Sequence, residues 1–208
     1  MKWIFSFCFF FSLSAGANSL ANRTNTNHTF LVGTEILSTW LPIKFTGSYT
    51  YIFNSIWSFE AEAARGKFGA QVLIFDVASV TEYRYSLLTR RYVGNSFNWI
   101  FGLYKDDFRA KIGSDFLDDM SDTSIDDLGV DVYGIVLGFG NRWQWRNGFT
   151  LSADWFRINA PVLGHKIKDG ILENIEDEND RDQVKSGIKK VTNLPTVVIL
   201  GLYLGYSF

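Results

Sequence analysis

Apolar side chains alternate with small or polar ones at the end of the chain, over Pro195–Phe208. The even positions form one unbroken apolar row, which consists of Val198, Leu200, Leu202, Leu204, Tyr206 and Phe208. Successive side chains of a strand point to opposite faces, so this row makes one wholly apolar face. Edge strands of soluble sheets are usually protected by charge or proline, whereas a barrel in lipid has no edge and an apolar outer face. The pattern predicts the closing strand of a membrane barrel; the alternative is a buried central strand of a soluble sheet.

The same alternation recurs along the chain and predicts eight strands. Their ranges are Phe30–Thr39, Ile43–Phe53, a strand from Trp57 to Ala63, Ser79–Tyr92, Phe97–Gly113, Val130–Gln144, Phe149–Pro161 and Pro195–Phe208. The fifth is less regular, because Lys105 and Asp107 fall on the same side as Trp99. Either a bulge shifts its register or the strand has left the membrane by that point.

The connections between these strands alternate in length. Three are short (Asn54-Ser55, Val93–Ser96 and Trp145–Gly148) and three are long (Gly66–Val77, Ser114–Gly129 and Val162–Leu194), while the seventh, Trp40–Pro42, is a tight turn on the outer side. Bacterial membrane barrels have an even number of strands, short periplasmic turns and longer extracellular loops. A soluble lipocalin-like barrel also has eight strands, but its apolar face points inward. The predicted fold is therefore an all-β, eight-stranded antiparallel up-and-down transmembrane β-barrel.

The N-terminus has the layout of a secretory signal peptide over residues 1–17. Lys2 is followed by the apolar run Ile4–Leu13, and Ala15–Ala17 offers small residues for cleavage before Asn18. This run is too short to cross a bilayer as a helix, which takes about 20 residues. The single cysteine lies within it, so the mature chain has no disulfide. We expect residues 18–29 to be a flexible leader and 30–208 to be the barrel.

Composition supports this class. The chain has 17% aromatic residues, 18 glycines and three prolines, as expected of a barrel with aromatic girdles. With Lys2 removed, 19 basic residues stand against 22 acidic ones, a net charge of −3. Nucleic-acid-binding domains are usually strongly basic, so no nucleic-acid partner is expected.

In this architecture the chain resembles the small eight-stranded outer-membrane β-barrels of Gram-negative bacteria, of the OmpA membrane-domain and OmpX type, over about residues 30–208. The most specific shared element is the C-terminal stretch Gly201–Phe208, with a final aromatic residue and apolar residues two apart before it. The resemblance implies that the barrel-assembly machinery recognises Leu202, Leu204, Tyr206 and Phe208 during insertion; the same residues would also face lipid. It implies a location in the bacterial outer membrane and contact with its lipid and lipopolysaccharide, but no activity. The oligomeric state does not follow from the sequence, and a monomer is favoured.

Charged residues on the other faces of these strands are expected to point into the lumen. They are Glu35, Glu60, Glu62, Glu82, Arg84, Arg90, Arg142 and Asp154. An eight-stranded barrel is barely wide enough to be filled by its own side chains, and unpaired buried charge is costly. We therefore predict a plug of paired charges, with a narrow gated pore or proton path as the alternative.

No enzyme, metal site or cofactor is expected. Some barrels of this membrane modify lipid A with a histidine and a serine, but neither His28 nor His165 has a serine at dyad spacing. The acidic segment Ser114–Leu128 lacks the spacing of an EF-hand loop, so it is either solvated or part of a divalent-ion lattice with lipopolysaccharide. The predicted role is structural or in surface interaction; the alternatives are a narrow, porin-like solute channel and, more distantly, a lipid A-modifying enzyme.

The last long connection differs from the others. Apolar residues recur every three to four positions within Lys166–Asn193, and a central acidic run is followed by lysines. This is helical periodicity, with charges arranged as the helix dipole favours. We predict a short helix in the last extracellular loop, or a solvated loop with transient helicity.

Overall fold

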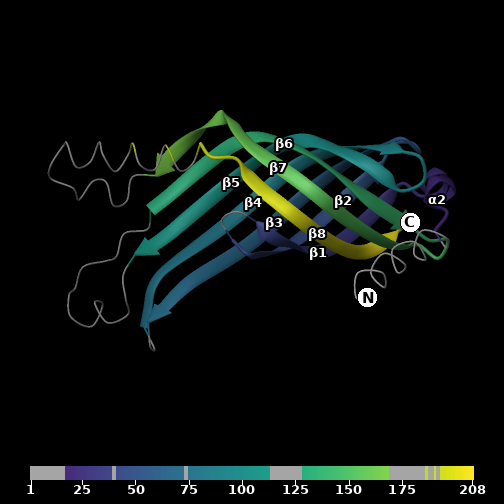
Figure 1. Cartoon of the computed structure of the whole chain (residues 1–208). Helices are drawn as coiled ribbons and strands as arrows, with labels where there is room; N and C mark the ends of the chain where they lie inside the picture. Colours follow the sequence, from purple (N-terminus) through teal and green to yellow (C-terminus); the bar gives the residue numbers. More distant parts are fainter. Residues whose placement is uncertain are drawn as a thin grey trace, which may run out of the picture.

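Eight antiparallel strands pair in chain order, and β1 pairs with β8, so the sheet closes into an up-and-down barrel (Figure 1). The predicted fold class is confirmed. The strands are β1 (His28–Ser38), β2 (Ile43–Ile52), β3 (Trp57–Val72), β4 (Phe75–Val93), β5 (Phe97–Ile112), β6 (Leu128–Gln144), β7 (Phe149–Lys168) and β8 (Thr196–Ser207). The structure is a computed structural model that describes residues 17–38, 41–72, 75–112, 128–168, 186, 190 and 193–208. No helix in these ranges is long and apolar enough to cross a bilayer.

The alternation of side chains fixes which face of the sheet points outward. Along β2 every odd residue is exposed and every even residue is buried. Outward Phe45 is 74% exposed, whereas its neighbour Lys44 is completely buried in the lumen. The same contrast recurs on β4, where Leu87 is 67% exposed and Arg84 is buried. The apolar rows therefore cover the outside and the charges fill the inside, the reverse of a soluble barrel.

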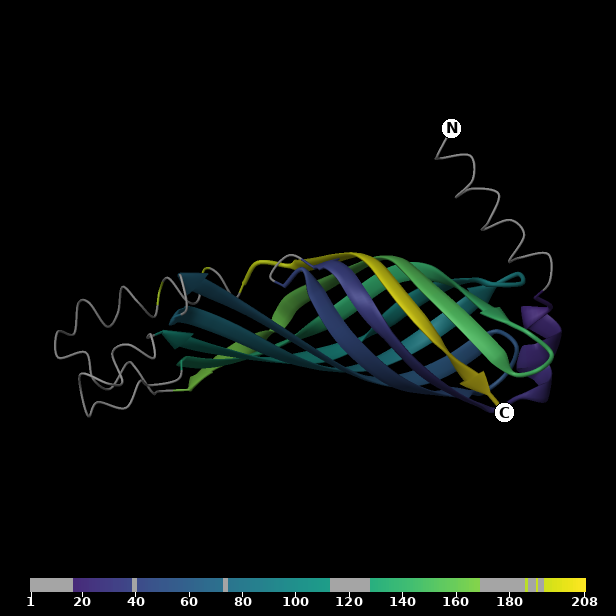
Figure 2. The ribbon, with the colours of Figure 1, turned by 90° about the horizontal axis from the view of Figure 1, so that it is seen from below.

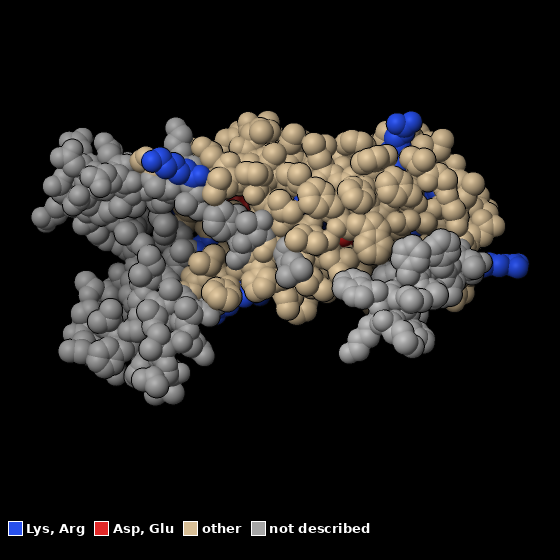
Figure 3. Space-filling view, viewed as in Figure 1, with Lys and Arg blue, Asp and Glu red and all other residues tan. Residues whose placement is uncertain are grey.

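The outer surface reflects this arrangement. In Figure 3 the described wall between the two ends of the barrel carries few charged atoms, and the blue cationic groups lie mainly toward the ends. Tyrosine, phenylalanine and tryptophan mark the wall near the short turns: Tyr51, Phe53, Trp57, Trp99, Phe149 and Tyr206 are all exposed there. Such aromatic girdles lie at the interface between membrane and water.

Two predicted loops are wrong in part, because strands continue through them. Residues 66–72 extend β3 and residues 75–77 belong to β4, with Val72 paired to Phe75. Only residues 73–74 join these two strands, in place of the predicted long loop Gly66–Val77. β7 likewise continues to Lys168, seven residues into the predicted insertion. Backbone pairing thus continues in both places beyond the residues whose alternation predicted a strand.

The remaining long connections fall mostly outside the described residues. These include the acidic segment up to residue 127 and, apart from Ser186 and Lys190, the predicted helix beyond residue 168.

The regular pairing of β5 bears on the position of Lys105 and Asp107. Its pairings with both β4 and β6 run without a register shift from Phe97 to Ala110. The proposed bulge is therefore absent, and both residues face outward together with Trp99. At about 3.4 Å per residue and a tilt of about 40°, a strand rises roughly 2.6 Å per residue along the barrel axis. The 19 residues of β4 thus rise about 50 Å, far more than an apolar band of about 25 Å. The second interpretation, that the strand leaves the membrane, fits these dimensions.

Bulges in β7 correct one predicted row. Register shifts occur opposite Phe139/Gly140 and opposite Tyr133/Ile135 of β6. Because of the first shift, the side chains of Asp154 and Arg157 both point into the lumen, although the two residues are three positions apart in the sequence. β8 follows the same change, so Val198 is 1% exposed and faces inward. The C-terminal apolar row is therefore interrupted at its start, and only its later members share the outer face.

The segment expected to be a flexible leader differs from that prediction. Residues Ser19–Asn25 form a helix, α2, and β1 begins at His28. Figure 2 shows α2 lying against the end of the barrel that carries the short turns. The Asn18 side chain caps this helix by accepting a hydrogen bond from the Ala21 backbone N–H at 3.4 Å. The leader folds because its polar groups find partners in the turns.

Arg23 of α2 ties the helix to two of these turns. Its guanidinium donates to the carbonyls of Ser55, Gly94 and Asn95 at 2.8–3.2 Å and lies 3.9 Å from the centre of the Tyr92 ring. The Ser19 hydroxyl accepts from the backbone of β6 at the third turn. The helix therefore touches all three short turns and covers this end of the lumen.

Candidate functional site: the lumenal charge network and the outer basic belt

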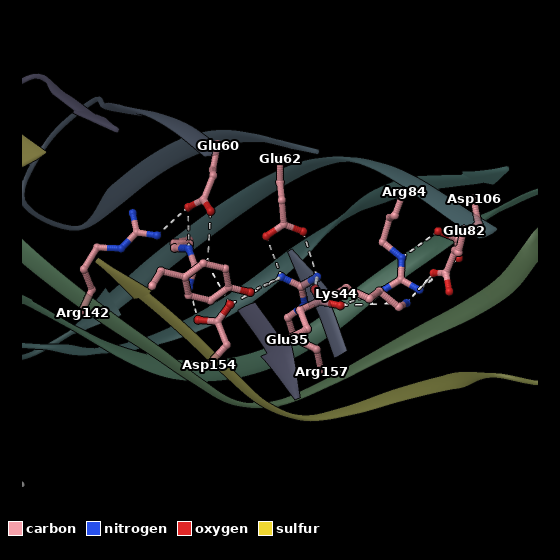
Figure 4. Close-up of polar contacts among 12 residues, drawn as sticks. Glu35, Lys44, Glu60, Glu62, Glu82, Arg84, Asp106, Arg142, Asp154 and Arg157 are labelled. Carbon is pink, nitrogen blue, oxygen red and sulfur yellow. Dashed lines mark hydrogen bonds and ion pairs between the residues drawn. The ribbon is translucent and has the colours of Figure 1, made fainter. Parts of the chain in front are cut away.

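Eleven charged side chains form one connected network along the lumen, and ten of them are labelled in Figure 4. The acidic members are Glu35, Glu60, Glu62, Glu82, Asp106 and Asp154, and the basic members are Lys44, Arg84, Arg90, Arg142 and Arg157. Each of their side chains is at most 4% exposed. The structure thus places all eight of the sequence-derived lumenal residues inside the barrel and joins them to three further ones.

At the short-turn end, Glu60 is shared by two arginines. Its Oε2 accepts from Arg90 Nε at 2.8 Å and from Arg142 Nη2 at 2.6 Å. Arg90 also makes a two-point contact with Asp154, with N–O distances of 2.7 and 2.9 Å. Paired N–H donors of this kind match a carboxylate and hold it in one orientation. The Thr50 hydroxyl completes the cluster, donating to Glu60 at 3.1 Å.

Arg157 connects the middle of the network. It binds both oxygens of Glu62 at 2.9 Å and donates to Glu35 at 2.6 Å. A longer contact of 3.5 Å joins it to Asp154 and so to the short-turn cluster. Glu62 and Glu35 therefore both receive their closest contacts from one guanidinium, whereas Asp154 is held mainly by Arg90.

At the opposite end, Arg84 makes a similar centre. Its Nε lies 2.7 Å from Asp106, and its Nη2 lies 2.8 Å from Glu82. Lys44 also pairs with Glu82, and Glu35 links this cluster to the middle one through Arg84 at 3.5 Å. Together, the three clusters replace a hydrophobic core with charge pairs.

One side of the lumen is apolar. Leu88, Ile100, Tyr104, Val130, Val132 and Val136 form a buried cluster on the inner faces of β4, β5 and β6. The charge network and this cluster divide the interior between them. Neither leaves its side chains open to solvent, so the described part of the lumen is filled.

Three members of the network were missed from the sequence, for different reasons. Lys44 lies on the same side of the alternation of Ile43–Phe53 as Thr46 and Ser48, and it should have been counted among the lumenal charges. Asp106 follows from continuing the alternation of β5 past Lys105, which the apparent irregularity of that strand obscured. Arg157 could not have been found, because an unbroken alternation from Asp154 would turn it outward. Only the bulge in β7 brings it into the lumen.

On the outside, charged residues lie beyond the apolar wall. Outward residues that pair across neighbouring strands form rows around the barrel. Two adjacent rows and the edge of a third carry six basic residues, which we call the outer basic belt: Arg65, Lys67, Lys105, Arg109, Lys166 and Lys168. Two acidic residues, Asp107 and Asp131, lie among them, so the described belt has an excess of four positive charges. The belt reaches β3 at Arg65, eight residues beyond Trp57, which is roughly 21 Å along the axis. That distance is close to the height of an apolar band.

The two acidic residues are held by lysines. Lys168 lies 2.8 Å from Asp131 and 3.3 Å from Asp107, and Lys105 lies 3.2 Å from Asp131. Partial burial acts to raise the pKa of Asp131, but hydrogen bonds from both lysines outweigh it and lower the pKa below its usual value. The hydrogen bond to Asp131 in turn raises the pKa of Lys168. These groups are therefore charged at neutral pH.

The C-terminal residues singled out from the sequence lie on the outer face of β8. Leu204, Tyr206 and Phe208 are 54–56% exposed, and Leu202 is partly buried. The Phe208 ring lies 6.0 Å from Phe30 across the seam between β8 and β1. Its backbone exchanges hydrogen bonds with His28 at 2.9 and 3.0 Å. The last residue of the chain thus closes the barrel as well as facing outward.

The histidines show no arrangement for catalysis in the described ranges. His28 lies in β1, where Nδ1 is 2.7 Å from the Tyr49 hydroxyl. His165 was expected in a loop but lies in β7 opposite Val132, and its ring makes no hydrogen bond to a described serine. Within the same ranges, no group of histidine, cysteine, aspartate or glutamate side chains could hold a metal ion.

A closed sheet, an apolar outer wall and an ion-paired interior define a transmembrane β-barrel of the small eight-stranded type. Neither a scan of protein-family models nor a search of curated proteins found a match. Among solved structures, the chain is similar to Ail, the attachment invasion locus protein of Yersinia pestis, at 12% identity and a TM-score of 0.46, covering 88% of this chain and 99% of Ail. The structure of Ail with the heparin analogue sucrose octasulfate gives 14% identity, a TM-score of 0.48 and coverage of 88% and 97%. The fold assignment itself rests on the strand pairing described above.

Proposed function

We propose that the protein is an integral barrel of the bacterial outer membrane with a structural or surface-interaction role and a lumen that does not conduct. The observation that carries this proposal is the connected network of charges, whose members are at most 4% exposed. A conducting pore needs a continuous water path, and the paired side chains together with α2 occupy that path. Any activity toward a partner would then reside in the outward parts of the barrel and in its extracellular end.

Single-channel recording in planar bilayers separates this proposal from a narrow solute channel. The folded protein is expected to give no discrete conductance steps at neutral pH. A control in which Arg90 and Glu60 are both replaced by serine removes part of the plug and should produce measurable current. Reproducible steps from the unmodified protein would overturn the proposal in favour of a channel.

Export with cleavage after Ala17 belongs to the same proposal. Removal of residues 1–17 would leave Asn18 at the N-terminus, directly before α2 and able to cap it. N-terminal sequencing of the protein purified from bacterial outer membranes is expected to begin at Asn18. A chain that retains the apolar segment in that fraction would contradict this step.

We further propose that Leu202, Leu204, Tyr206 and Phe208 act as a recognition signal for the barrel-assembly machinery. Their outward position on the closing strand, with the last aromatic ring at the seam, supports this role. Replacing Phe208 with alanine is expected to lower the fraction of heat-modifiable protein in cells while leaving spontaneous refolding in detergent nearly unchanged. The matched control is Ile199→Ala, an equally exposed residue of the same strand. Equal loss in both settings would indicate a purely structural role.

A further inference from the structure

The outer wall contains a groove of about 840 Å³ whose lining residues come from β1 to β7. Its floor is made of small residues: Gly47 on β2, and Ala61 and Ala63 on β3. A Cβ atom added at Gly47 would meet nothing within 4 Å, so the floor is open to the outside. The volume falls in the range of small-ligand sites, about 300–1,000 Å³.

Strand register explains why the groove forms there. Two adjacent rows of outward residues cross the sheet; one carries small residues on both β2 and β3, and the other carries Ala61 of β3 between Tyr49 and Leu87. Gly47 and Ala63 lie in one row between Val32 and Tyr85. Larger aromatic and aliphatic side chains therefore form the walls, and the chain itself leaves the floor unfilled.

The groove meets the outer basic belt at one end. Lys105 lines the groove and also belongs to the belt, and Arg65 lies two residues beyond Ala63 on the same face of β3. Within the apolar wall, apolar contact alone gives little preference for one occupant, because lipid tails are as apolar as the groove. Charge at its end therefore decides which lipid remains there.

The position of the belt identifies the leaflet. The belt lies on the side of the barrel opposite the short turns, which is the extracellular side in bacterial barrels. Its excess of four positive charges is spread over β3, β5 and β7, so it is complementary to a headgroup with more than one phosphate. A phospholipid with a single phosphate would leave most of the belt uncompensated.

We infer that this groove binds an acyl chain of a phosphorylated, multiply acylated glycolipid of the outer leaflet, of the lipid A type, and that the belt binds its phosphates. This inference rests on the proposed outer-membrane location. Arg65 and Lys105 hold the headgroup at the mouth of the groove, and the chain fills the space over Ala63. Removal of a basic residue near an anionic membrane surface weakens attraction by about fivefold in affinity.

Native mass spectrometry of the folded barrel in detergent tests this site. Lipid A, phosphatidylglycerol and phosphatidylethanolamine are added separately to the unmodified protein and to variants. The expected result is selective retention of lipid A, with about 25-fold weaker binding by the Arg65→Gln/Lys105→Gln variant and a clear loss for Ala63→Phe, which fills the groove. The matched controls are Arg91→Gln, at the opposite end of the wall, and Ile199→Phe, on another part of it; both should retain lipid A like the unmodified protein.

Three results would overturn the inference. Equal retention of all three lipids would show that the site does not select phosphates. Normal binding by Ala63→Phe would place the lipid elsewhere. Cross-linking of two chains through Ala63→Cys that excess lipid A, present during the reaction, does not prevent would assign the groove to a second copy of the chain. Failure of this inference is distinguishable from failure of the proposed function: a barrel that shows heat-modifiable migration but does not bind lipid A refutes only the lipid site.

Discussion

Replacing Arg157 with methionine removes the guanidinium at the middle of the lumenal network while keeping an unbranched side chain about as long as the stem of arginine. The change leaves Glu62 without its two 2.9 Å contacts and Glu35 without its contact at 2.6 Å. Removing one partner of a buried ion pair costs about 3–5 kcal/mol, because an uncompensated charge remains. Since Arg157 makes the closest contacts of two carboxylates, Glu62 and Glu35, we expect a loss in the free energy of unfolding at the upper end of that range.

The measurement is equilibrium unfolding in urea of the barrel folded into lipid vesicles, followed by tryptophan fluorescence. A double-mutant cycle with Glu62→Gln isolates the pair, and the double variant should recover at least about 1 kcal/mol relative to the sum of the single changes. Arg91→Met is the matched control, since Arg91 faces outward and lies 5.7 Å from the Trp57 ring. It should cost less than about 1 kcal/mol. A loss for Arg157→Met as small as that of the control, or no coupling to Glu62, would refute a network that holds the barrel together.

Three further predictions concern the seam, the belt and the helix. A Cβ at Gly205 would lie 1.8 Å from the carbonyl oxygen of Phe30, so Gly205→Ala should force β8 and β1 apart and lower the free energy of unfolding by about 3 kcal/mol or more. Gly47→Ala should be nearly neutral, because a Cβ there meets no atom within 4 Å. Chemical unfolding of both variants measures the difference, and similar losses would contradict the close approach at the seam. Because the pKa of Asp131 is lowered in the folded barrel, its ion pairs add stability that is complete above the ordinary pKa of 3.8 and is lost as pH falls through the lowered value. Chemical unfolding measured between pH 7 and 3 should show a loss of less than about 1 kcal/mol from these ion pairs, and Asp131→Asn should abolish that loss. Arg23→Ala should release α2 and increase backbone hydrogen exchange in residues 19–25, and unchanged exchange there would show that the helix does not depend on Arg23.

The sequence was sufficient for the class of fold because the alternation along strands such as β2 is nearly perfect. Its inner positions Lys44, Thr46, Ser48 and Thr50 are all buried. Strand ends were less predictable, since the rule used to end a strand was loss of the apolar row. β3 continues past Gly66 because backbone pairing persists outside the lipid, where an apolar face is no longer required.

Bulges limited the prediction of the lumen and of the closing strand. A bulge changes the face of every residue that follows, and no residue type near Trp155 announces it. For this reason Val198 was assigned to the wrong face, and Arg157 was not assigned to the lumen. The helix at residues 19–25 was missed because its stability comes from Arg23 contacts with distant turns rather than from its own sequence.

The central claim is that odd residues of β2 face lipid and even residues face a packed, charged lumen. Single cysteines placed from Phe45 to Ile52, each carrying a fluorophore in the barrel folded into vesicles, test it with nitroxide-labelled lipids as quenchers. Strong quenching is expected at Phe45, Gly47, Tyr49 and Tyr51, and weak quenching at the residues between them. Quenching of the opposite phase, or of equal strength at every position, would contradict it.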